Sequence, residues 1–439
     1  MTTSIQLMRK RRFLPLFLTQ LLNALNDNLY KNAMVLFVVY AIYDSPEMET
    51  LISGIATALF VLPFVLFSAT AGQLADMRDK TVIIRWIKFA EIIIMAVGAT
   101  GLLLASRGVK VEGLALPLMF AALFAMGVHS TFFGPIKYAI LPQHLHKDEV
   151  LAGTGLVEAG TYVAILVGMM LGGAMHITDS IVAVIAIALI GYAICRWVPP
   201  APPQTDETRV DWNPVRASKS LVAFAFRNPE LRYSVLAISF FWAIAAILSV
   251  QFIPLAKNVL LADKQVAAVL LVAFSAGIAI GSVSINALLK GDISARYSAG
   301  AVLALAVLLI AFYGITRIWN LAPASGELFA VSEFLAQPLA LVLLGNLLLI
   351  AVAGGMFVVP LYAFLTTRVD KSEASRSVAA NNFISSVFMV IGAGIAGALG
   401  LLGIPLQEQL LMSLVLCVLC AHLARKLHAT EALRMPEAP

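Results

Sequence analysis

Charged side chains and cysteines are both scarce in this chain. Asp, Glu, Lys and Arg make up 13% of the 439 residues, about half the share that a soluble domain carries. Hydrophobic residues reach 60%, and the mean hydropathy is +0.91. These values exclude a soluble enzyme, a disordered protein and a collagen-like protein. Three cysteines are too few to staple a chain of this length, so a disulfide scaffold is excluded as well.

Signatures of enzymes and metal sites are also missing. The sequence holds no P-loop and no zinc-ligand spacing, and no His is followed five residues later by Asp, the pairing used by glycerolipid acyltransferases. His144 has Glu149 at that spacing, in a loop. Cys417-x-x-Cys420 lies in an apolar run, which favours packing cysteines over a redox pair. We therefore expect no enzyme activity, no cofactor and no metal.

Long apolar runs dominate the sequence, and a membrane-spanning helix needs about 20 such residues. The basic N-terminus followed by an apolar run resembles a signal peptide, but no small-residue cleavage site follows, so we expect this segment to be retained as the first span. Twelve spans are predicted, at 13–42, 50–75, 81–105, 114–134, 150–174, 178–197, 231–256, 265–289, 297–316, 337–365, 373–400 and 406–424. The chain is thus predicted to be an all-α membrane protein.

The distribution of basic residues predicts the orientation, because cytoplasmic loops are rich in Lys and Arg. With both termini in the cytoplasm, Lys31, Lys88 and Lys137 fall inside spans or at their ends. Of the other twenty-seven Lys and Arg, twenty-two lie on the cytoplasmic side and five on the outer side: Arg107, Lys110, Lys257, Lys264 and Arg317. The net charge of +5 therefore indicates topology and does not favour nucleic-acid binding.

A polar, proline-rich segment at 198–230 divides the chain into two halves. We expect six-helix bundles at 1–197 and 231–439, joined by this cytoplasmic linker. The halves resemble each other at an offset of 224, which aligns Tyr138 with Tyr362, Gly168 with Gly392, and Glu158 with Asn382. Two such halves resemble the major facilitator architecture. Two small-xxx-small patterns, Gly168-x3-Gly172 and Gly277-x3-Gly281, predict close helix crossings.

The loop after the second span, Gly72-Gln-Leu-Ala-Asp76-Met-Arg78-Asp79-Lys80, resembles the G-x-L-x-D-R-x-x-R/K signature of that superfamily. Gly72 would let two helices approach closely. Asp76 would accept hydrogen bonds from a helix N-terminus or pair with an Arg, and so latch the two halves on the cytoplasmic side. The alternative is a generic charged turn. Its second-half counterpart, GDISARY at 291–297, is too degenerate to support a role.

Ionisable residues inside spans are costly and usually mark a pathway. Asp27 and Lys31 stand at i, i+4 in the first span and share a face with Asn23, so we expect Asp27 and Lys31 to pair. These residues either form a polar stripe that faces a cavity, or they form a structural ion pair that stabilises packing.

Further polar residues lie in later spans. Lys88 and Glu91 stand at i, i+3 in the third span, where Lys88 either contributes to the site or extends to the lipid headgroups. His129 in the fourth span is either a packed histidine or a proton relay. Lys137 either binds an anionic phosphate or obeys the positive-inside rule. The remaining candidates for substrate binding are Glu158, Asn381 and Asn382.

Three blocks resemble the bacterial lysophospholipid transporter family of the major facilitator superfamily. They are FLTQLLNALNDNLYKNA at 17–33, FFGPIKYAILPQHLHKDEVLAGTGLVEAGTYVAILVGMMLGG at 132–173 and AGGMFVVPLYAFLTTR at 353–368. The resemblance implies a flippase that moves lysophospholipids, chiefly lysophosphatidylethanolamine, from the outer to the inner leaflet of the bacterial inner membrane by alternating access. It also implies re-acylation by an acyltransferase/acyl-carrier-protein synthetase partner, a domain that we expect to be absent from this chain. We expect a monomer.

The resemblance also carries roles to individual positions. It matches the family's conserved polar residues to Asp27, Lys88, Lys137 in its P-x-K-Y motif, Glu158 and Asn382. Relatives have an arginine where Ser249 stands and a glutamate where Ser385 stands, so one cation and one anion are lost together. We therefore expect Lys31 to take the arginine's place beside Asp27. Asp27 would then bind the ammonium of ethanolamine-phosphate, and Lys31 and Lys137 would bind the phosphate.

Two other functions fit parts of the pattern. A multidrug or amphiphile exporter of the same superfamily could be coupled to protons through Asp27 and Glu158. A non-transporting scaffold that docks a lipid acylation enzyme is disfavoured, because it gives the intramembrane charges no use. The low polarity of the C-terminal spans favours a lipid substrate over a sugar or an amino acid.

Overall fold

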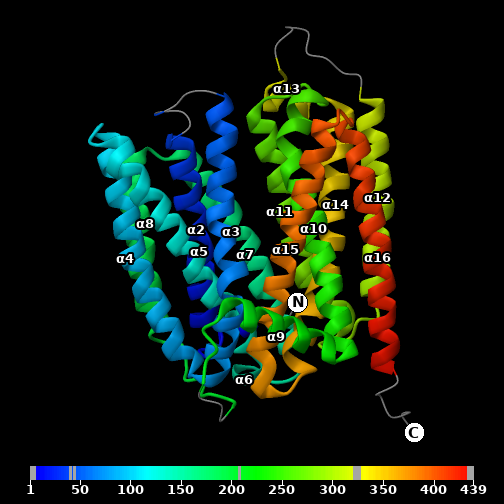
Figure 1. Cartoon of the computed structure of the whole chain (residues 1–439). Helices are drawn as coiled ribbons and strands as arrows, with labels where there is room; N and C mark the ends of the chain where they lie inside the picture. The colour runs from blue at the N-terminus through cyan, green and yellow to red at the C-terminus, as the bar shows by residue number, and fades with distance from the viewer. Residues whose placement is uncertain (1–5, 39–41, 43–45, 206–208, 320–327, 433–439) are drawn as a thin grey trace. The chain divides into compact units, whose positions relative to one another are not determined.

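The computed structural model describes residues 6–38, 42, 46–205, 209–319 and 328–432, and its regular elements are helices throughout (Figure 1). Short helical segments are η2 (Val111–Ala115), α6 (Leu141–His144), α9 (Pro214–Arg227), α13 (Val331–Leu335) and η3 (Lys371–Glu373). The long helices are α2 (Leu14–Phe37), α3 (Pro46–Met77), α4 (Lys80–Ser106), α5 (Leu116–Ala139), α7 (Val150–Ala174), α8 (Ile177–Cys195), α10 (Pro229–Asn258), α11 (Lys264–Leu289), α12 (Ser298–Ile318), α14 (Pro338–Thr367), α15 (Ala374–Leu401) and α16 (Leu406–Ala432).

Most of the long helices are apolar enough to cross a membrane. Within the described residues, eleven segments have the required length and hydropathy, and together they correspond to the second to twelfth predicted spans. Helix α2 is not among them, although it has 24 residues, because Asn, Gln, Asp and Lys side chains interrupt its apolar sequence. The chain is therefore a multi-pass membrane protein, and the assignment of α2 as a twelfth span stays a prediction.

Capping side chains and prolines fix where several helices begin. The Asp79 carboxylate accepts from the Thr81 and Val82 amides at the start of α4, and Asp263 does the same for Gln265 and Val266 at the start of α11. Proline occupies the first turn of α2, α5, α10 and α14, where its missing N–H costs nothing. These residues therefore define where each of these membrane helices begins.

The chain separates into two compact units. One unit comprises residues 2–224 together with 369–383, and the other comprises residues 225–368 and 384–439. The first ten residues of α15 thus group with the N-terminal helices, for a reason that the contacts of Asp76 explain below. The division into bundles at 1–197 and 231–439 stays a prediction.

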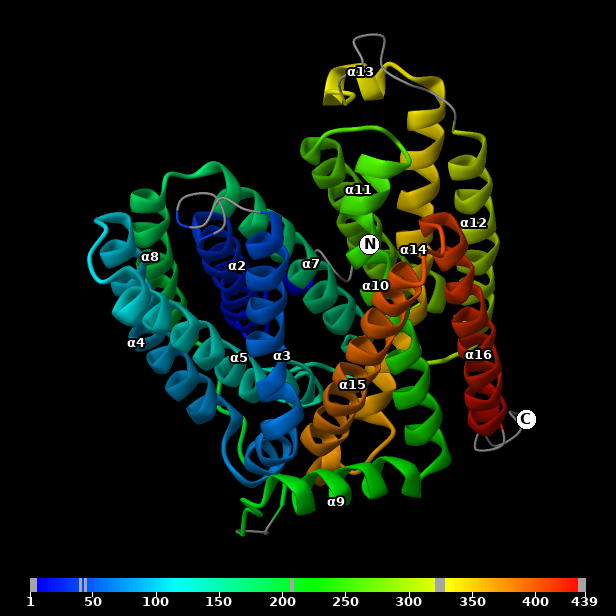
Figure 2. The ribbon, with the colours of Figure 1, turned by 45° about the horizontal axis from the view of Figure 1, so that its top comes forward.

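The segment at 198–230 contains more structure than a linker requires. Its proline-rich start is tied to the loop between α3 and α4, because the Lys80 amide donates to the Ala201 carbonyl (2.9 Å) and the Thr81 hydroxyl to the Pro199 carbonyl (2.6 Å). Helix α9 then runs crosswise to α3 (Figure 2). Its buried face carries Ala217, Leu221 and Phe224 at helical spacing.

Glycines allow close helix crossings within each unit. A Cβ on Gly168 or Gly172 of α7 would lie within 3 Å of the Leu25 or Leu29 carbonyl of α2. A Cβ on Gly392 of α15 would lie 3.2 Å from the Ala243 carbonyl of α10. Gly168 and Gly392 are the residues that the internal repeat aligns, and each brings the fifth long helix of its half against the first. Both small-xxx-small patterns mark close crossings, as predicted.

Gly281 offers a direct test of this packing. In α11, a Cβ on Gly281 would overlap the Val352 carbonyl of α14. We expect Gly281→Leu to lower the free energy of unfolding by about 1–3 kcal/mol through overpacking, measured as a lower melting temperature in detergent. The matched control is Gly300→Leu on α12, where a Cβ would meet no atom within 4 Å. Equal melting temperatures for both variants would contradict the assigned crossing.

Candidate functional site

Asp27 lies in the middle of α2 with only 5% of its surface exposed. Its Oδ2 accepts hydrogen bonds from the Ser130 hydroxyl of α5 and from Asn23 Nδ2 one turn earlier (3.3 Å). Asp27 Oδ1 and Asn23 Oδ1 are buried and have no hydrogen-bond partner. An unpaired buried acceptor costs about 1–3 kcal/mol, and more for a charged group. Two such oxygens on one face of α2 are able to receive donors from a ligand.

The expected pairing of Asp27 with Lys31 is wrong. The two residues form no ion pair, and Lys31 Nζ lies 5.5 Å from the centre of the Phe60 ring of α3. The i, i+4 spacing placed both residues on neighbouring turns, but Ser130 and Asn23 supply hydrogen bonds to the carboxylate without an ion pair. Lys31 is therefore held by the face of an aromatic ring, an arrangement that stabilises an ammonium group.

Glu91 of α4 is the centre of a second buried cluster. Lys88 Nζ forms an ion pair with it, and both side chains are 0% exposed. Asn26 Nδ2 of α2 donates to Glu91 Oε1 (2.8 Å), and His129 Nε2 of α5 lies 3.4 Å from Glu91 Oε2. Lys88 therefore does not extend to the lipid headgroups. The cluster joins three helices beside Asp27, which follows Asn26 directly in α2.

Glu158 and Lys137 lie within a third set of contacts. The Tyr138 hydroxyl of α5 donates to Glu158 of α7. Lys137 Nζ lies 3.5 Å from Thr161 Oγ1, and the Thr161 hydroxyl donates to Gln20 Oε1 of α2 (3.0 Å). An electrostatic attraction also links Lys137 to Glu158. The structure therefore brings together a lysine and a carboxylate that the sequence had placed on two separate helices.

The start of α15 adds two amides to the same unit. Asn381 is fully buried, and neither its Oδ1 nor its Nδ2 has a hydrogen-bond partner. Asn382 Nδ2 lies 2.8 Å from where a Cβ on Gly134 of α5 would be, so Asn382 packs directly against α5. The Asn382 side chain thus faces the helix that carries Ser130 and Lys137.

Asp76 binds the N-terminus of α15. Its two carboxylate oxygens accept from the backbone amides of Ser375 (2.9 Å) and Arg376 (3.0 Å). The first turn of a helix is electropositive and has free N–H groups, so a buried carboxylate is well placed there. A Cβ on Gly72 would lie 2.5 Å from the Ala379 Cβ, and glycine is therefore required for this contact. These contacts explain why residues 369–383 group with the N-terminal helices.

The other two residues of the predicted gating loop have different surroundings. Arg78 is exposed, whereas the side chain of Lys80 is fully buried, and its Nζ has no hydrogen-bond partner. Asp79 caps α4 and also accepts from the Ala201 amide (3.3 Å). The loop is thus a junction between α15 and the start of the 198–230 segment.

Removing the Asp76 charge tests this junction. We expect Asp76→Asn to raise amide hydrogen exchange at Ser375 and Arg376 at least about ten-fold, because hydrogen bonds to charged groups contribute about 1.5–3 kcal/mol. Exchange measured by mass spectrometry on peptides covering 369–380 would show the increase. Asp79→Asn, which changes the same charge three residues away, should leave these amides protected. Unchanged exchange in Asp76→Asn would show that the loop is a simple turn.

The C-terminal unit is less polar within its described spans. Ser239 and Ser385 share a hydrogen bond between their hydroxyls (3.1 Å), and Ser249 lies within α10. Trp242 Nε1 donates to the Tyr362 hydroxyl (2.9 Å). Tyr362 is the residue that the repeat aligns with Tyr138, so both tyrosines are buried and hydrogen-bonded, one to a carboxylate and one to an indole.

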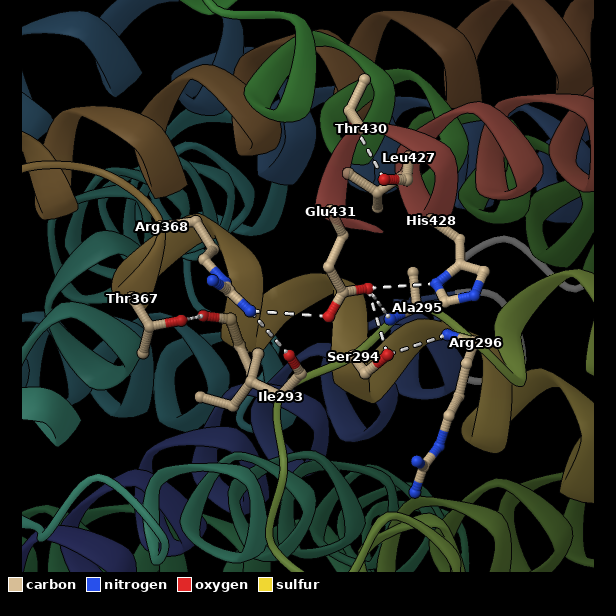
Figure 3. Close-up of polar contacts among 11 residues, drawn as sticks. Ile293, Ser294, Ala295, Arg296, Thr367, Arg368, Leu427, His428, Thr430 and Glu431 are labelled. Atoms are coloured by element: carbon tan, nitrogen blue, oxygen red, sulfur yellow. Dashed lines mark hydrogen bonds and ion pairs between the residues drawn. The ribbon is translucent and has the colours of Figure 1, made fainter. Parts of the chain in front are cut away.

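One charged cluster in this unit was missed from the sequence (Figure 3). Glu431, near the end of α16, accepts from the Ser294 hydroxyl (3.0 Å) and the Ala295 amide (3.1 Å). Arg368 Nη2 lies 3.5 Å from its Oε1, and His428 Nδ1 lies 3.3 Å from its Oε2. The loop at 291–297 is thus held by a carboxylate more than 130 residues away, a contact that local sequence does not reveal.

Among the described residues, no group of three or more His, Cys, Asp or Glu side chains is arranged to hold a metal ion. The three cysteines are buried and not paired with one another.

Long apolar helices with buried polar side chains define the class as a polytopic α-helical membrane protein with an intramembrane polar site. The sequence profile of the Major Facilitator Superfamily matches residues 16–392. The chain belongs to this superfamily, and it is a transporter rather than an enzyme.

Known proteins of similar sequence are bacterial. The chain is 28% identical over 394 residues to the lysophospholipid transporter LplT of Klebsiella pneumoniae (strain 342), covering 88% of each protein. It is 27% identical over 398 residues to the lysophospholipid transporter LplT of Escherichia coli (strain K12 / DH10B), again covering 88% of each. These relatives match the family that the sequence blocks resemble.

Solved structures share the fold at low identity. A bacterial homologue of the iron transporter ferroportin, in an outward-facing state, has a TM-score of 0.72 at 14% identity and covers 96% of this chain and 100% of its own. The human organic anion transporter MFSD10 (TETRAN) has a TM-score of 0.71 at 14% identity, covering 94% of this chain and 99% of its own. At this identity the likeness shows the fold alone.

Proposed function

We propose that this protein transports lysophospholipids, such as lysophosphatidylethanolamine, from the outer to the inner leaflet of the bacterial inner membrane by alternating access. The observation that carries the proposal is the buried Asp27 carboxylate, which has one oxygen without a hydrogen-bond partner and whose other oxygen accepts from Ser130 of α5, the helix that also carries Lys137. A carboxylate and a lysine in one apolar unit complement the ammonium and the phosphate of an ethanolamine headgroup. The lysophospholipid transporters among its relatives support this substrate class.

The proposed binding residues have distinct roles. Asp27 and Asn23 accept hydrogen bonds from the ammonium group, while Lys31 and Lys137 bind the phosphate. Glu158 attracts the ammonium group of Lys137 and so helps to position it. Lys88 forms an ion pair with Glu91 on α4, next to α2. Asn381 and Asn382 offer amide groups from α15. The apolar side chains that surround this set accommodate the single acyl chain, since such contacts need no polar partner.

A binding measurement separates this substrate from its competitors. Purified protein is titrated with lysophosphatidylethanolamine, with the soluble headgroup glycerophosphoethanolamine and with a cationic amphiphilic drug, and its melting temperature is recorded. A ligand that binds the folded protein raises its melting temperature. We therefore expect stabilisation by the lysophospholipid, weaker stabilisation by the headgroup, and none by the drug. Stabilisation by the drug alone would favour the exporter, and no stabilisation by any of the three would favour the scaffold.

The proposal includes, as partner, an acyltransferase/acyl-carrier-protein synthetase that re-acylates the product. It also includes an orientation with both termini in the cytoplasm. The bias of Lys and Arg toward one side supports the orientation. In a variant without native cysteines, a cysteine replacing Lys110 should react with an impermeant maleimide added outside intact cells. A cysteine replacing Ser220 should react only after the cells are opened. The reverse pattern would refute the orientation.

A further inference from the structure

A groove lies beside α9 that the transport proposal does not use. It has a volume of about 590 Å³ and is lined by Val65 and Leu66 of α3, Phe383 of α15, and Val215, Val222 and Lys219 of α9, with small residues between them. All of these residues belong to one compact unit. Lys219 is the single charged residue among those that line it.

Fixed contacts hold both sides of the groove in place. The Asp211 amide, just before α9, donates to Gln73 Oε1 in the last turns of α3 (2.8 Å). Near the other end of α9, the Arg376 guanidinium lies 5.7 Å from the centre of the Phe224 ring. Helix α9 is therefore attached beside the end of α3 and beside the first turn of α15, and the groove between them is a built feature of the unit.

The residues of α3 and α15 that line the groove lie about one leaflet's thickness from the ends of their helices. Leu66 lies eleven residues before the end of α3 at Met77, or roughly 16 Å along the helix, and Phe383 lies nine residues after the start of α15, or roughly 13 Å. The hydrocarbon core is about 30 Å thick, so one leaflet is about 15 Å. An apolar groove whose lining residues lie this far from the helix ends fits an acyl chain better than a water-soluble anion.

The outer face of α9 is suited to a membrane surface. Trp212, two residues before α9, is 72% exposed, and Val215, in the first turn of α9 and at the edge of the groove, is 62% exposed, whereas Ala217, Leu221 and Phe224 are buried in the protein. Tryptophan is enriched where membranes meet water. An exposed tryptophan at the start of an amphipathic helix that is packed on the protein is expected to contact lipid.

Lys219 is available for a ligand. It is exposed, and among the described residues it forms neither an ion pair nor a hydrogen bond. Its neighbour Arg216 is already engaged by Asp211 through two hydrogen bonds (2.6 and 2.8 Å), and this guanidinium lowers the pKa of the Asp211 carboxyl to about 2. The ionised Asp211 is therefore paired with Arg216, and it is not the partner of Lys219, which lines the apolar groove.

We propose that this groove binds one anionic phospholipid of the adjacent leaflet, with an acyl chain between α3, α9 and Phe383 and with its phosphate at Lys219. Such a lipid would be a resident component of the α9 junction and not the transported substrate. The proposal does not depend on the substrate assigned above, because it uses none of the same residues.

Native mass spectrometry of the delipidated full chain tests this site. The protein is titrated with dioleoyl phosphatidylglycerol, dioleoyl phosphatidylcholine and glycerol 3-phosphate. We expect one phosphatidylglycerol to bind most tightly, and Lys219→Gln to weaken it about five-fold, the effect of one basic residue at an anionic lipid surface. Lys147→Gln, which removes an exposed lysine elsewhere in the same unit, should leave the affinity unchanged.

A second variant tests the groove independently of the charge. Ala223 lines the groove and is exposed, so Ala223→Trp should fill it, and the tight phosphatidylglycerol adduct should be lost while the melting temperature without lipid is kept. The proposal is overturned if Ala223→Trp binds phosphatidylglycerol as the wild type does, or if Lys219→Gln and Lys147→Gln are indistinguishable. It is also overturned if glycerol 3-phosphate displaces the lipid at equal concentration, because the acyl chain would then contribute nothing.

Discussion

Replacing Lys88 with methionine is expected to prevent the protein from folding to a stable state. Lys88 and Glu91 are fully buried and paired, and removing one partner leaves the other as an isolated buried charge. Breaking such a pair costs about 3–5 kcal/mol, a large fraction of the stability of a typical domain. His129 and Asn26 remain beside Glu91, but neither carries the permanent positive charge that the lysine supplied.

The double variant Lys88→Met with Glu91→Gln should recover most of the loss. Glutamine keeps an oxygen that accepts from Asn26 Nδ2, and neither position of the former Lys88–Glu91 pair then carries a charge. Yield of monodisperse protein and melting temperature in detergent are the measurements, with Lys147→Met as the exposed control. A wild-type melting temperature for Lys88→Met alone would show that the pair contributes nothing to folding.

Replacing Asp27 with asparagine is expected to remove transport while leaving the fold intact. Asparagine retains an oxygen for the hydrogen bonds from Ser130 and Asn23, so the melting temperature should be unchanged. The ammonium of the substrate loses its anionic partner, and a charge-assisted hydrogen bond contributes about 1.5–3 kcal/mol. Lysophosphatidylethanolamine transport should therefore fall about ten- to hundred-fold.

Two further variants give this prediction its controls. Asp179→Asn removes an exposed carboxylate in the first turn of α8 and should transport normally. Lys31→Met should reduce transport without lowering stability, because Lys31 forms no ion pair whose loss would leave Asp27 isolated. Full transport by Asp27→Asn, measured in proteoliposomes beside these two controls, would show that the carboxylate contributes only to packing.

Features encoded by local pattern could be predicted from the sequence. Hydropathy was enough to locate the long helices, and the glycine spacing at Gly168 and Gly172 identified a close crossing that the backbone contacts confirm. The loop signature predicted that Asp76 would either accept from a helix N-terminus or pair with an Arg, and Asp76 accepts from the N-terminus of α15. In each case the chemistry depends on a few neighbouring residues and on the period of a helix.

Features that depend on partners far along the chain could not be predicted. The i, i+4 rule suggested that Asp27 pairs with Lys31, but Ser130, more than 100 residues later, provides the hydrogen bond instead. Asn26 and His129 meet Glu91 from two other helices, and no local pattern links them. Helix α9 was overlooked because its segment is polar and rich in proline at the start, and its buried face is evident only once α3 and α15 are in place.

Transport in reconstituted vesicles tests the central claim most directly. Labelled lysophosphatidylethanolamine is placed in one leaflet of proteoliposomes, and its appearance in the other leaflet is followed by back-extraction for wild type, Asp27→Asn, Asp179→Asn and protein-free vesicles. We predict rapid transfer by wild type and Asp179→Asn, and transfer near the protein-free level for Asp27→Asn. Transfer by the wild type no faster than in protein-free vesicles, with the protein folded, would contradict the proposed function.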